Sequence, residues 1–291
     1  MTEELSLLSV HAHPDDESSK GAGTVAKYHS EGVHCVLVCC TGGEEGDILN
    51  PAMNRPEIVE NLPAIRAKEL DHAASIIGYD EVERLGYRDS GMPGSEANER
   101  PDSFAKAPVE KATGRLVAVV RRVRPQVMVI YPGYQTTYPH PDHIRAHEVG
   151  LAAFDASGDP DAFPEAGPVW QPEKLYYILW SKKRMLALAE KFVELGLEQP
   201  WGEERLKRMT DAPQEEITTV VDVAPWARVR EAALLAHETQ VDPNSPFWFG
   251  LPADVADALG HYEEYHLARN FTASRPPEDD LFAGVRQRAS I

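Results

Sequence analysis

The chain has 291 residues, 42% hydrophobic and 26% charged, which is enough to bury a sizeable core and unlike the composition of a disordered segment. Its 47 acidic and 29 basic residues give a formal net charge of -18, and a field of that sign repels a phosphate backbone, so no nucleic-acid partner is expected. Apolar runs stay far below the roughly 20 residues of a spanning helix, so we expect no membrane partner and a cytoplasmic location.

Strand-like and helix-like segments alternate through the first half of the chain. Apolar runs predict strands at 5–10, 34–41, 82–85 and 127–131. Helical spacing of apolar residues, with Pro and Gly at the ends, predicts helices over 21–30, 63–77, 109–123 and 144–158. This alternation predicts an α/β fold with a mostly parallel, Rossmann-like sheet flanked by helices.

The pattern changes after about residue 160. Strands are predicted at 175–180 and 217–223, and helices at 185–195 and 226–236. The stretch 242–280 is rich in Pro and aromatic residues, which predicts irregular structure that covers another part of the protein. Within it, His261, Tyr262 and His266 are typical of an ordinary helix surface. We expect residues 1–291 to form a single domain, with an α/β core over 1–160 and an elaborated C-terminal part over 161–291 that completes the pocket.

The three cysteines all lie in one predicted strand. Cys35, Cys39 and Cys40 are too few and too close in sequence for a disulfide framework, and no Cys-x-x-Cys pair suggests a thiolate metal site. We expect buried strand thiols.

Two short clusters of imidazole and carboxylate groups follow predicted strands: residues 11–17 (HAHPDDE) and residues 138–143 (YPHPDH). Ligands in open α/β sheets bind beyond the carboxyl ends of the strands. Long loops at 42–57, 88–107 and 132–137 follow other strands and would wall a pocket at the same edge. The sequence therefore predicts a site where the two clusters meet.

These clusters contain the parts of an open metal site. A catalytic zinc takes three protein ligands and leaves a position for water. His13 and Asp16 are close enough in sequence to fold around one ion, and His143 could reach it from the fourth strand. Zn²⁺ is the expected metal, and Fe²⁺ suits the same donors.

The remaining residues of the clusters could move protons and stabilise charge. Asp15, left free by the metal, is placed to act as general base and acid. His140 and Tyr138 could donate to an oxyanion, and the Asp142 carboxylate is expected to orient His140.

Structural alternatives exist for each of these residues. Either cluster alone could be a turn in which Asp15 or Asp16 caps the next helix. Glu45, Arg66 and Asp89 are candidates for substrate contacts, although charged residues on loops and helix faces are more often simply solvated.

Residues 12–17 and 140–143 resemble the two zinc motifs of the LmbE-like family of zinc-dependent N-acylglucosamine deacetylases. Flanking segments resemble the mycothiol S-conjugate amidases of that family, at 18–21, 48–53, 239–243, 275–277 and 281–284. The resemblance implies an LmbE-type fold, zinc on His13, Asp16 and His143, general acid-base work by Asp15, and oxyanion stabilisation by His140 with Tyr138. It also implies that the substrate lies near a set of polar residues: Lys20, Arg66, Asp89 and Gln240.

The implied reaction is hydrolysis of the amide between an S-conjugated N-acetylcysteine and glucosaminyl-inositol, which releases a mercapturic acid in thiol-dependent detoxification. The partner is then a small-molecule thiol conjugate. The sequence does not indicate which oligomeric state the protein has. One alternative is deacetylation of N-acetylglucosaminyl-inositol by the same chemistry. Another, of a different class, is a noncatalytic sugar-binding protein with a structural metal. The loop 131–137 departs from similar proteins, being one residue longer and lacking their acidic residue and Asn-Gly-Gly turn.

Overall fold

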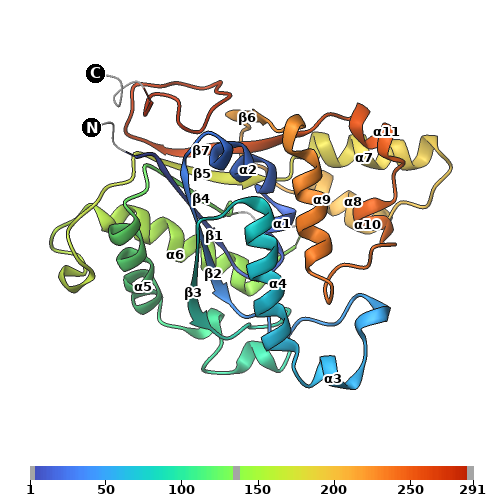
Figure 1. Ribbon diagram of the computed structural model, residues 1–291, viewed down its shortest axis with the longest axis horizontal. Coiled ribbons are helices and arrows are strands. Elements are labelled where there is room, and N and C mark those ends of the chain that lie inside the picture. Colours follow the sequence, from blue (N-terminus) through green and yellow to red (C-terminus); the bar gives the residue numbers. More distant parts are fainter. Residues whose placement is uncertain (1–3, 134–137, 287–291) are drawn as a thin grey trace.

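The computed structural model describes residues 4–133 and 138–286 (Figure 1). Within these residues the strands form one seven-stranded sheet in the order β3-β2-β1-β4-β5-β7-β6. The strands are β1 (Ser6–His11), β2 (His34–Thr41), β3 (Glu81–Tyr87), β4 (Val127–Ile130), β5 (Lys174–Leu179), β6 (Thr219–Asp222) and β7 (Tyr262–Asn270). Residues 134–137 of the unusual loop lie outside the described residues.

Parallel pairing joins the first five strands, and β7 pairs antiparallel with both β5 and β6. Central strands such as β2 are buried on both faces, as their continuous apolar sequence predicts. The predicted α/β fold with a mostly parallel sheet is confirmed.

Helices cover both faces of the sheet (Figure 1). The α-helices are α1 (Asp16–Ser19), α2 (Ala22–Ser30), α3 (Pro56–Val59), α4 (Leu62–Ile77), α5 (Val109–Val123), α6 (Pro141–Ser157), α7 (Lys182–Glu194), α8 (Glu203–Asp211), α9 (Ala227–Ala236), α10 (Pro246–Phe249) and α11 (Ala253–Ala258). Single-turn 3₁₀ helices lie at Pro51–Met53, Ala97–Glu99, Phe104–Lys106, Pro164–Ala166 and Ala224–Trp226.

Alternate residues of each strand enter two cores on opposite faces. Leu7 packs with α2, α4 and α9 on one face, and Leu8 packs with α5 and α6 on the other. The three cysteines are buried free thiols, as expected, with Cys40 on the opposite face from Cys39. No helix of the described residues is long and apolar enough to span a bilayer.

The prediction for 242–280 is wrong in part. Residues 262–270 form β7, a nine-residue strand, so Tyr262 and His266 lie on a strand and not on a helix surface. This strand is only partly buried, and its sequence, YEEYHLARN, has no apolar run from which a strand could be predicted. It forms by main-chain pairing with β5 and β6, which its sequence pattern does not show. The His266 ring stacks on Tyr177 of β5.

The C-terminal segment closes over the sheet through a buried ion pair. Lys174, fully buried on β5, donates to Glu278 Oε1 at 2.8 Å, and Tyr176 donates to Glu278 Oε2 at 2.6 Å. Burial alone would raise the pKa of Glu278, but the Lys174 ammonium outweighs it and holds the pKa below its ordinary value.

Replacing Glu278 by Ala is expected to lower the free energy of unfolding by about 3 kcal/mol, because Lys174 is left charged and unpaired in the core. Urea unfolding would measure the change, with Glu278→Gln as the control that keeps the side-chain volume and one of the two acceptor oxygens and loses less. A loss below about 1 kcal/mol, the value of a surface pair, would contradict this.

Candidate active site

The two sequence clusters meet at the carboxyl ends of β1 and β4, which are neighbours in the sheet. His13 follows β1, and Asp16 opens α1. His143 lies in the first turn of α6, which starts at Pro141, three residues earlier than predicted. Pro at this first position suits a helix start, and His140 caps the helix by accepting from the Asp142 backbone N–H at 3.2 Å.

His13, Asp16 and His143 bring donor atoms within 4.8 Å of one another, and all three are buried. Asp16 Oδ2 lies 3.3 Å from His13 Nδ1 and 3.3 Å from His143 Nε2. The other oxygen, Asp16 Oδ1, accepts from Lys20 Nζ at 2.8 Å. Burial raises the pKa of Asp16, but Lys20 and His143 outweigh it and hold this carboxyl well below its ordinary range, so it is ionised.

The donor set fits a divalent cation. His143 Nε2 is buried without a hydrogen-bond partner in the described structure, and coordination would satisfy it. Tyr131 stacks on the His143 ring at 4.5 Å between centroids, which fixes the plane of that imidazole. Two imidazoles and one carboxylate make an open three-ligand set.

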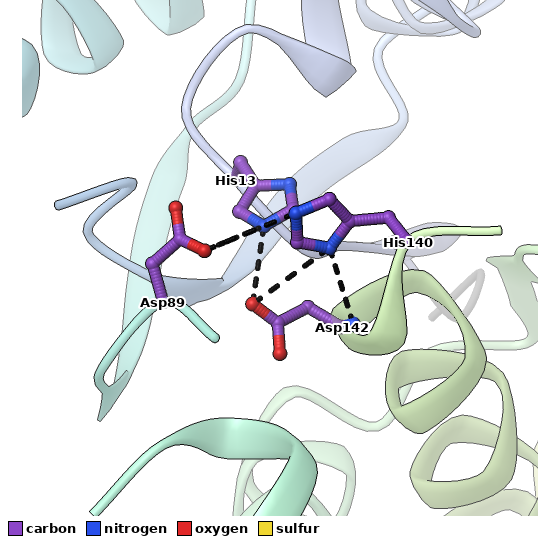
Figure 2. A group of neighbouring side chains, drawn as sticks. All are labelled: His13, Asp89, His140 and Asp142. Carbon is purple, nitrogen blue, oxygen red and sulfur yellow. Dashed lines mark hydrogen bonds and ion pairs between the residues drawn. The ribbon is translucent and has the colours of Figure 1, made fainter. Parts of the chain in front are cut away.

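A second group shares His13: Asp89, His140 and Asp142 also surround it (Figure 2). The carboxylate oxygens of this group already accept hydrogen bonds from the protein. Asp142 Oδ2 accepts from the Ser90 backbone N–H at 2.9 Å, and its Oδ1 accepts from the Ser90 hydroxyl. Asp89 Oδ1 accepts from the Gly91 backbone N–H at 2.8 Å. Because the unpartnered Nε2 belongs to His143, the group with Asp16 and His143 is the better candidate metal centre.

The Asp142 carboxylate lies closer to His13 than to His140, the residue that it was predicted to orient. It lies 3.2 Å from His13 Nε2 but 4.0 Å from His140 Nδ1, which instead accepts from the Asp142 main chain (Figure 2). The carboxylate is therefore placed to orient His13, whose Nε2 faces Asp142 and whose Nδ1 faces Asp16. This is the usual arrangement of a carboxylate behind a metal-binding imidazole.

Replacing Asp142 by Asn is expected to weaken metal affinity by about 10–100-fold, because the neutral amide is a weaker acceptor for His13 Nε2–H than the carboxylate. Competition with a chromophoric chelator would measure the dissociation constant. Ser90→Ala, which removes one donor to Asp142 and leaves its charge, should have a smaller effect, and an unchanged affinity in the Asn variant would contradict this role.

Asp15 lies beside the candidate metal centre in an unusual backbone conformation. Its φ is +108°, which residues other than glycine rarely adopt, and its side chain makes no helix-capping hydrogen bond. The capping alternative for Asp15 is thus not supported by the structure. Arg66 Nη2 donates to Asp15 Oδ2 at 3.2 Å and to the Pro14 carbonyl at 2.7 Å, which leaves Asp15 Oδ1 free of this contact. Burial raises the pKa of Asp15 to about 6 although Arg66 opposes it.

Glu17 stabilises the turn that contains Asp15, and this role could not be predicted from the sequence. The fully buried Glu17 accepts from the Asp15 backbone N–H at 2.9 Å and from His237 Nε2 at 2.6 Å. Burial lowers the pKa of His237, but the Glu17 carboxylate outweighs it and raises the pKa above its ordinary value. His237 stands at the end of α9, 220 residues away, so only the tertiary structure could pair them.

His140 is buried and neutral. Burial, together with His13, lowers the pKa of His140 to about 4, and its Nδ1 accepts from the main chain, so the ring proton is on Nε2. Tyr138 is 42% exposed, with its ring 5.8 Å from His140 and 5.3 Å from His143. Both residues border the same cavity as the candidate metal centre.

The residues predicted to touch substrate all line that cavity, whose volume is about 500 Å³: Lys20, Glu45, Arg66, Asp89 and Gln240. Several also have structural partners. Lys20 is paired with Asp16, Glu45 with Arg88 at 2.7 Å, and Gln240 Nε2 donates to the Asp47 carbonyl at 3.1 Å.

Arg66 is almost fully buried and serves mainly to position the turn. Its Nη1 donates to the Gly43 carbonyl at 2.5 Å. Gly43 has φ +67°, and a Cβ there would lie 2.3 Å from Arg66 Nη1, so only glycine fits. The contacts of Tyr131 and Ser90 with the site were not predicted from the sequence. In the sequence Tyr131 is only the last residue of an apolar run, and no motif includes Ser90.

The fold and the site together define a class. A mostly parallel α/β sheet carries, at the ends of its central strands, buried imidazoles and a carboxylate that can hold a metal, and the Asp15 carboxylate stands in the same turn outside that donor set. This is the arrangement of a metal-assisted hydrolase.

The chain belongs to the PIG-L family, described as GlcNAc-PI de-N-acetylase, whose model matches residues 8–154. It is 44% identical to a mycothiol S-conjugate amidase from Streptomyces coelicolor, over 99% of this chain and 100% of that protein. It is 41% identical to a 1D-myo-inositol 2-acetamido-2-deoxy-alpha-D-glucopyranoside deacetylase from Streptomyces avermitilis, over 96% of this chain and 97% of that protein.

Among solved structures, the N,N'-diacetylchitobiose deacetylase from Pyrococcus horikoshii superposes with a TM-score of 0.63. It covers 92% of this chain and 85% of that one at 18% identity, so it shows the shared fold alone. With the family and these relatives, the predictions of an LmbE-like chain and of an amide-hydrolysing enzyme are confirmed.

Proposed function

We propose that this chain hydrolyses the amide bond of mycothiol S-conjugates, giving a mercapturic acid and glucosaminyl-inositol. The observation that carries the reaction is the Asp15 carboxylate, which follows His13 in the same turn, is not one of the three convergent metal donors, and has one oxygen that Arg66 does not contact. The choice of substrate rests on the similarity, over nearly the full length of both chains, to the amidase of Streptomyces coelicolor.

In this proposal His13 Nδ1, Asp16 and His143 Nε2 hold Zn²⁺. When bound, the metal supplies Lewis-acid polarisation of the amide carbonyl and acidifies the attacking water. The fully buried Asp142 carboxylate keeps His13 in the tautomer that leaves Nδ1 free for the metal. Lys20 Nζ donates a hydrogen bond to Asp16 Oδ1 and balances the charge of that carboxylate.

Proton transfer is assigned to Asp15. Its free oxygen takes the proton of the water that attacks the carbonyl carbon and returns it to the leaving amine nitrogen. Arg66 and Glu17 fix the carboxylate in place by holding the Asp15 side chain and backbone. Neutral His140 donates from Nε2, and Tyr138 from its hydroxyl, to the oxygen that becomes negative.

The acid limb of kcat/KM is expected at or somewhat below pH 6. Burial raises the pKa of Asp15 to about 6, and a nearby cation would lower it. A general base works only when ionised, so the rate rises with pH through that value and levels off above it. A pH profile of kcat/KM measures this, and Asp15→Asn should lose the limb. A wild-type profile flat down to pH 4 would contradict the assignment.

The alternative is deacetylation of the acetylated pseudodisaccharide, and the 41% identity to the Streptomyces avermitilis deacetylase supports it. The test is a rate comparison on purified protein offered a bimane conjugate of mycothiol and N-acetylglucosaminyl-inositol. A higher kcat/KM for the conjugate supports our proposal, and a higher value for the acetyl compound overturns it.

A further inference from the structure

The cavity differs in character on the two sides of the candidate metal centre. Its polar side is bordered by loops that follow β2 and β3: Glu45, Asp47 and Asp89. Its apolar side begins directly after β5, at Trp180. The sheet order places β2 and β3 on one side of the β1-β4 pair and β5 on the other, so the two walls lie on opposite sides of His13 and His143.

The apolar side is an aromatic wall, which consists of Trp180, Trp201, Phe247 and Trp248. Trp180 stacks on Phe247 at 6.3 Å between ring centroids, and Phe247 meets Trp248 edge to face at 4.5 Å. Trp201 lies 6.1 Å from Phe247 and is buried against α7 with Phe192. The wall is therefore a pre-formed surface anchored in its own small core, near α7, α8 and α10 (Figure 1).

Arg205 lies over the Phe247 ring and Arg230 over the Trp248 ring, but part of this wall is left open to a ligand. Trp180 is 39% exposed although it has two aromatic neighbours, while Trp201 behind it is buried. Phe247 and Trp248 are half-buried and line the cavity. Rings of this kind bind flat or bulky apolar groups, by stacking and by removing apolar area from water.

We infer that the aromatic wall is the subsite for the sulfur substituent of the conjugate, and that it favours aromatic or large apolar adducts. The inference rests on the proposed function, because the substrate there has an apolar thioether substituent on one side of the scissile amide and a polyol on the other. The carboxylates of the polar side can accept hydrogen bonds from sugar and inositol hydroxyls, whereas the rings of the aromatic wall offer an apolar surface that suits the sulfur substituent.

All four aromatic residues lie outside residues 8–154, the part that matches the family model. The part that matches the family model thus carries the metal donors and Asp15, and the C-terminal part, which the amidase and deacetylase relatives also cover, carries the aromatic wall.

The test compares two conjugates of one thiol, with bimane and with acetamide on the sulfur. Trp180→Ala should lower kcat/KM for the bimane conjugate by about tenfold, mainly through KM, because a stacking partner is lost. The same variant should change kcat/KM for the acetamide conjugate by less than about twofold. Trp248→Ala is the second variant, and Phe271→Ala, which removes an exposed ring outside the cavity, is the matched control that leaves both rates unchanged.

The outcomes separate the two proposals. If wild-type protein cleaves neither conjugate, the proposed function fails and the subsite fails with it. If wild-type protein cleaves both, but folded Trp180→Ala and Trp248→Ala variants lose both rates equally or keep both, the subsite alone is overturned. The midpoint of thermal unfolding establishes that each variant is folded.

Discussion

Replacing Asp15 by Asn is expected to lower turnover by roughly two to four decades, the usual contribution of a general acid-base group, while metal content stays near one equivalent. The metal donors are unchanged in this variant, since Asp15 faces Arg66 and not the donor atoms of His13, Asp16 and His143. Asn is preferred to Ala because it tolerates the positive φ that Asp15 adopts, so the turn keeps its shape.

The stability of the same variant separates catalysis from misfolding. A carboxyl whose pKa is raised in the folded state stabilises the fold below its unfolded pKa of 3.8 and loses that contribution as the pH rises through about 6. Ionised Asp15 thus disfavours folding at pH 8, and the Asn variant should melt there no lower than wild type. Asp71→Asn, on the outer surface of α4, is the control for loss of a carboxylate. Unchanged turnover in Asp15→Asn would leave the mechanism without its base.

Removing the metal is expected to lower the rate by at least about three decades, since Lewis-acid stabilisation is worth several kcal/mol and each decade corresponds to about 1.4 kcal/mol. Dialysis against a chelator followed by titration with Zn²⁺ or Fe²⁺ measures both the loss and its recovery, and shows which ion restores the higher rate. Recovery should be complete at one equivalent. The His143→Ala variant should not regain activity when metal is added, because it lacks the buried Nε2 that is free to coordinate the ion.

The protein without metal should stay folded. His13 and His143 are held at the ends of β1 and α6 by two apolar cores that do not involve the metal. Far-UV circular dichroism before and after chelation measures this. Full activity at background metal content would exclude a metal-dependent mechanism. Collapse of the fold on chelation would instead indicate a structural metal, as in the noncatalytic sugar-binding alternative.

Most of the α/β half could be predicted from the sequence. Runs such as 34–41 are apolar on both faces and end at turn residues, so local composition determines the strand, and β2 has the predicted bounds. The order of strand, cluster and helix also predicts that His13 and His143 approach each other, because parallel strands end at one edge of the sheet. Their binding of a metal stays a prediction.

The sequence by itself determined which residue types stand at the strand ends, and hence the chemistry that the site can offer. Only the tertiary structure decided which atom faces which partner. The Asp142 carboxylate lies closer to His13 than to its near neighbour His140, and Glu17 binds His237, which is distant in the sequence. Likewise β7 exists through pairing with β5 and β6, not through its own apolar pattern. The physical reason is that caps and apolar periodicity act over a few residues, whereas side-chain direction and strand pairing depend on how distant segments pack.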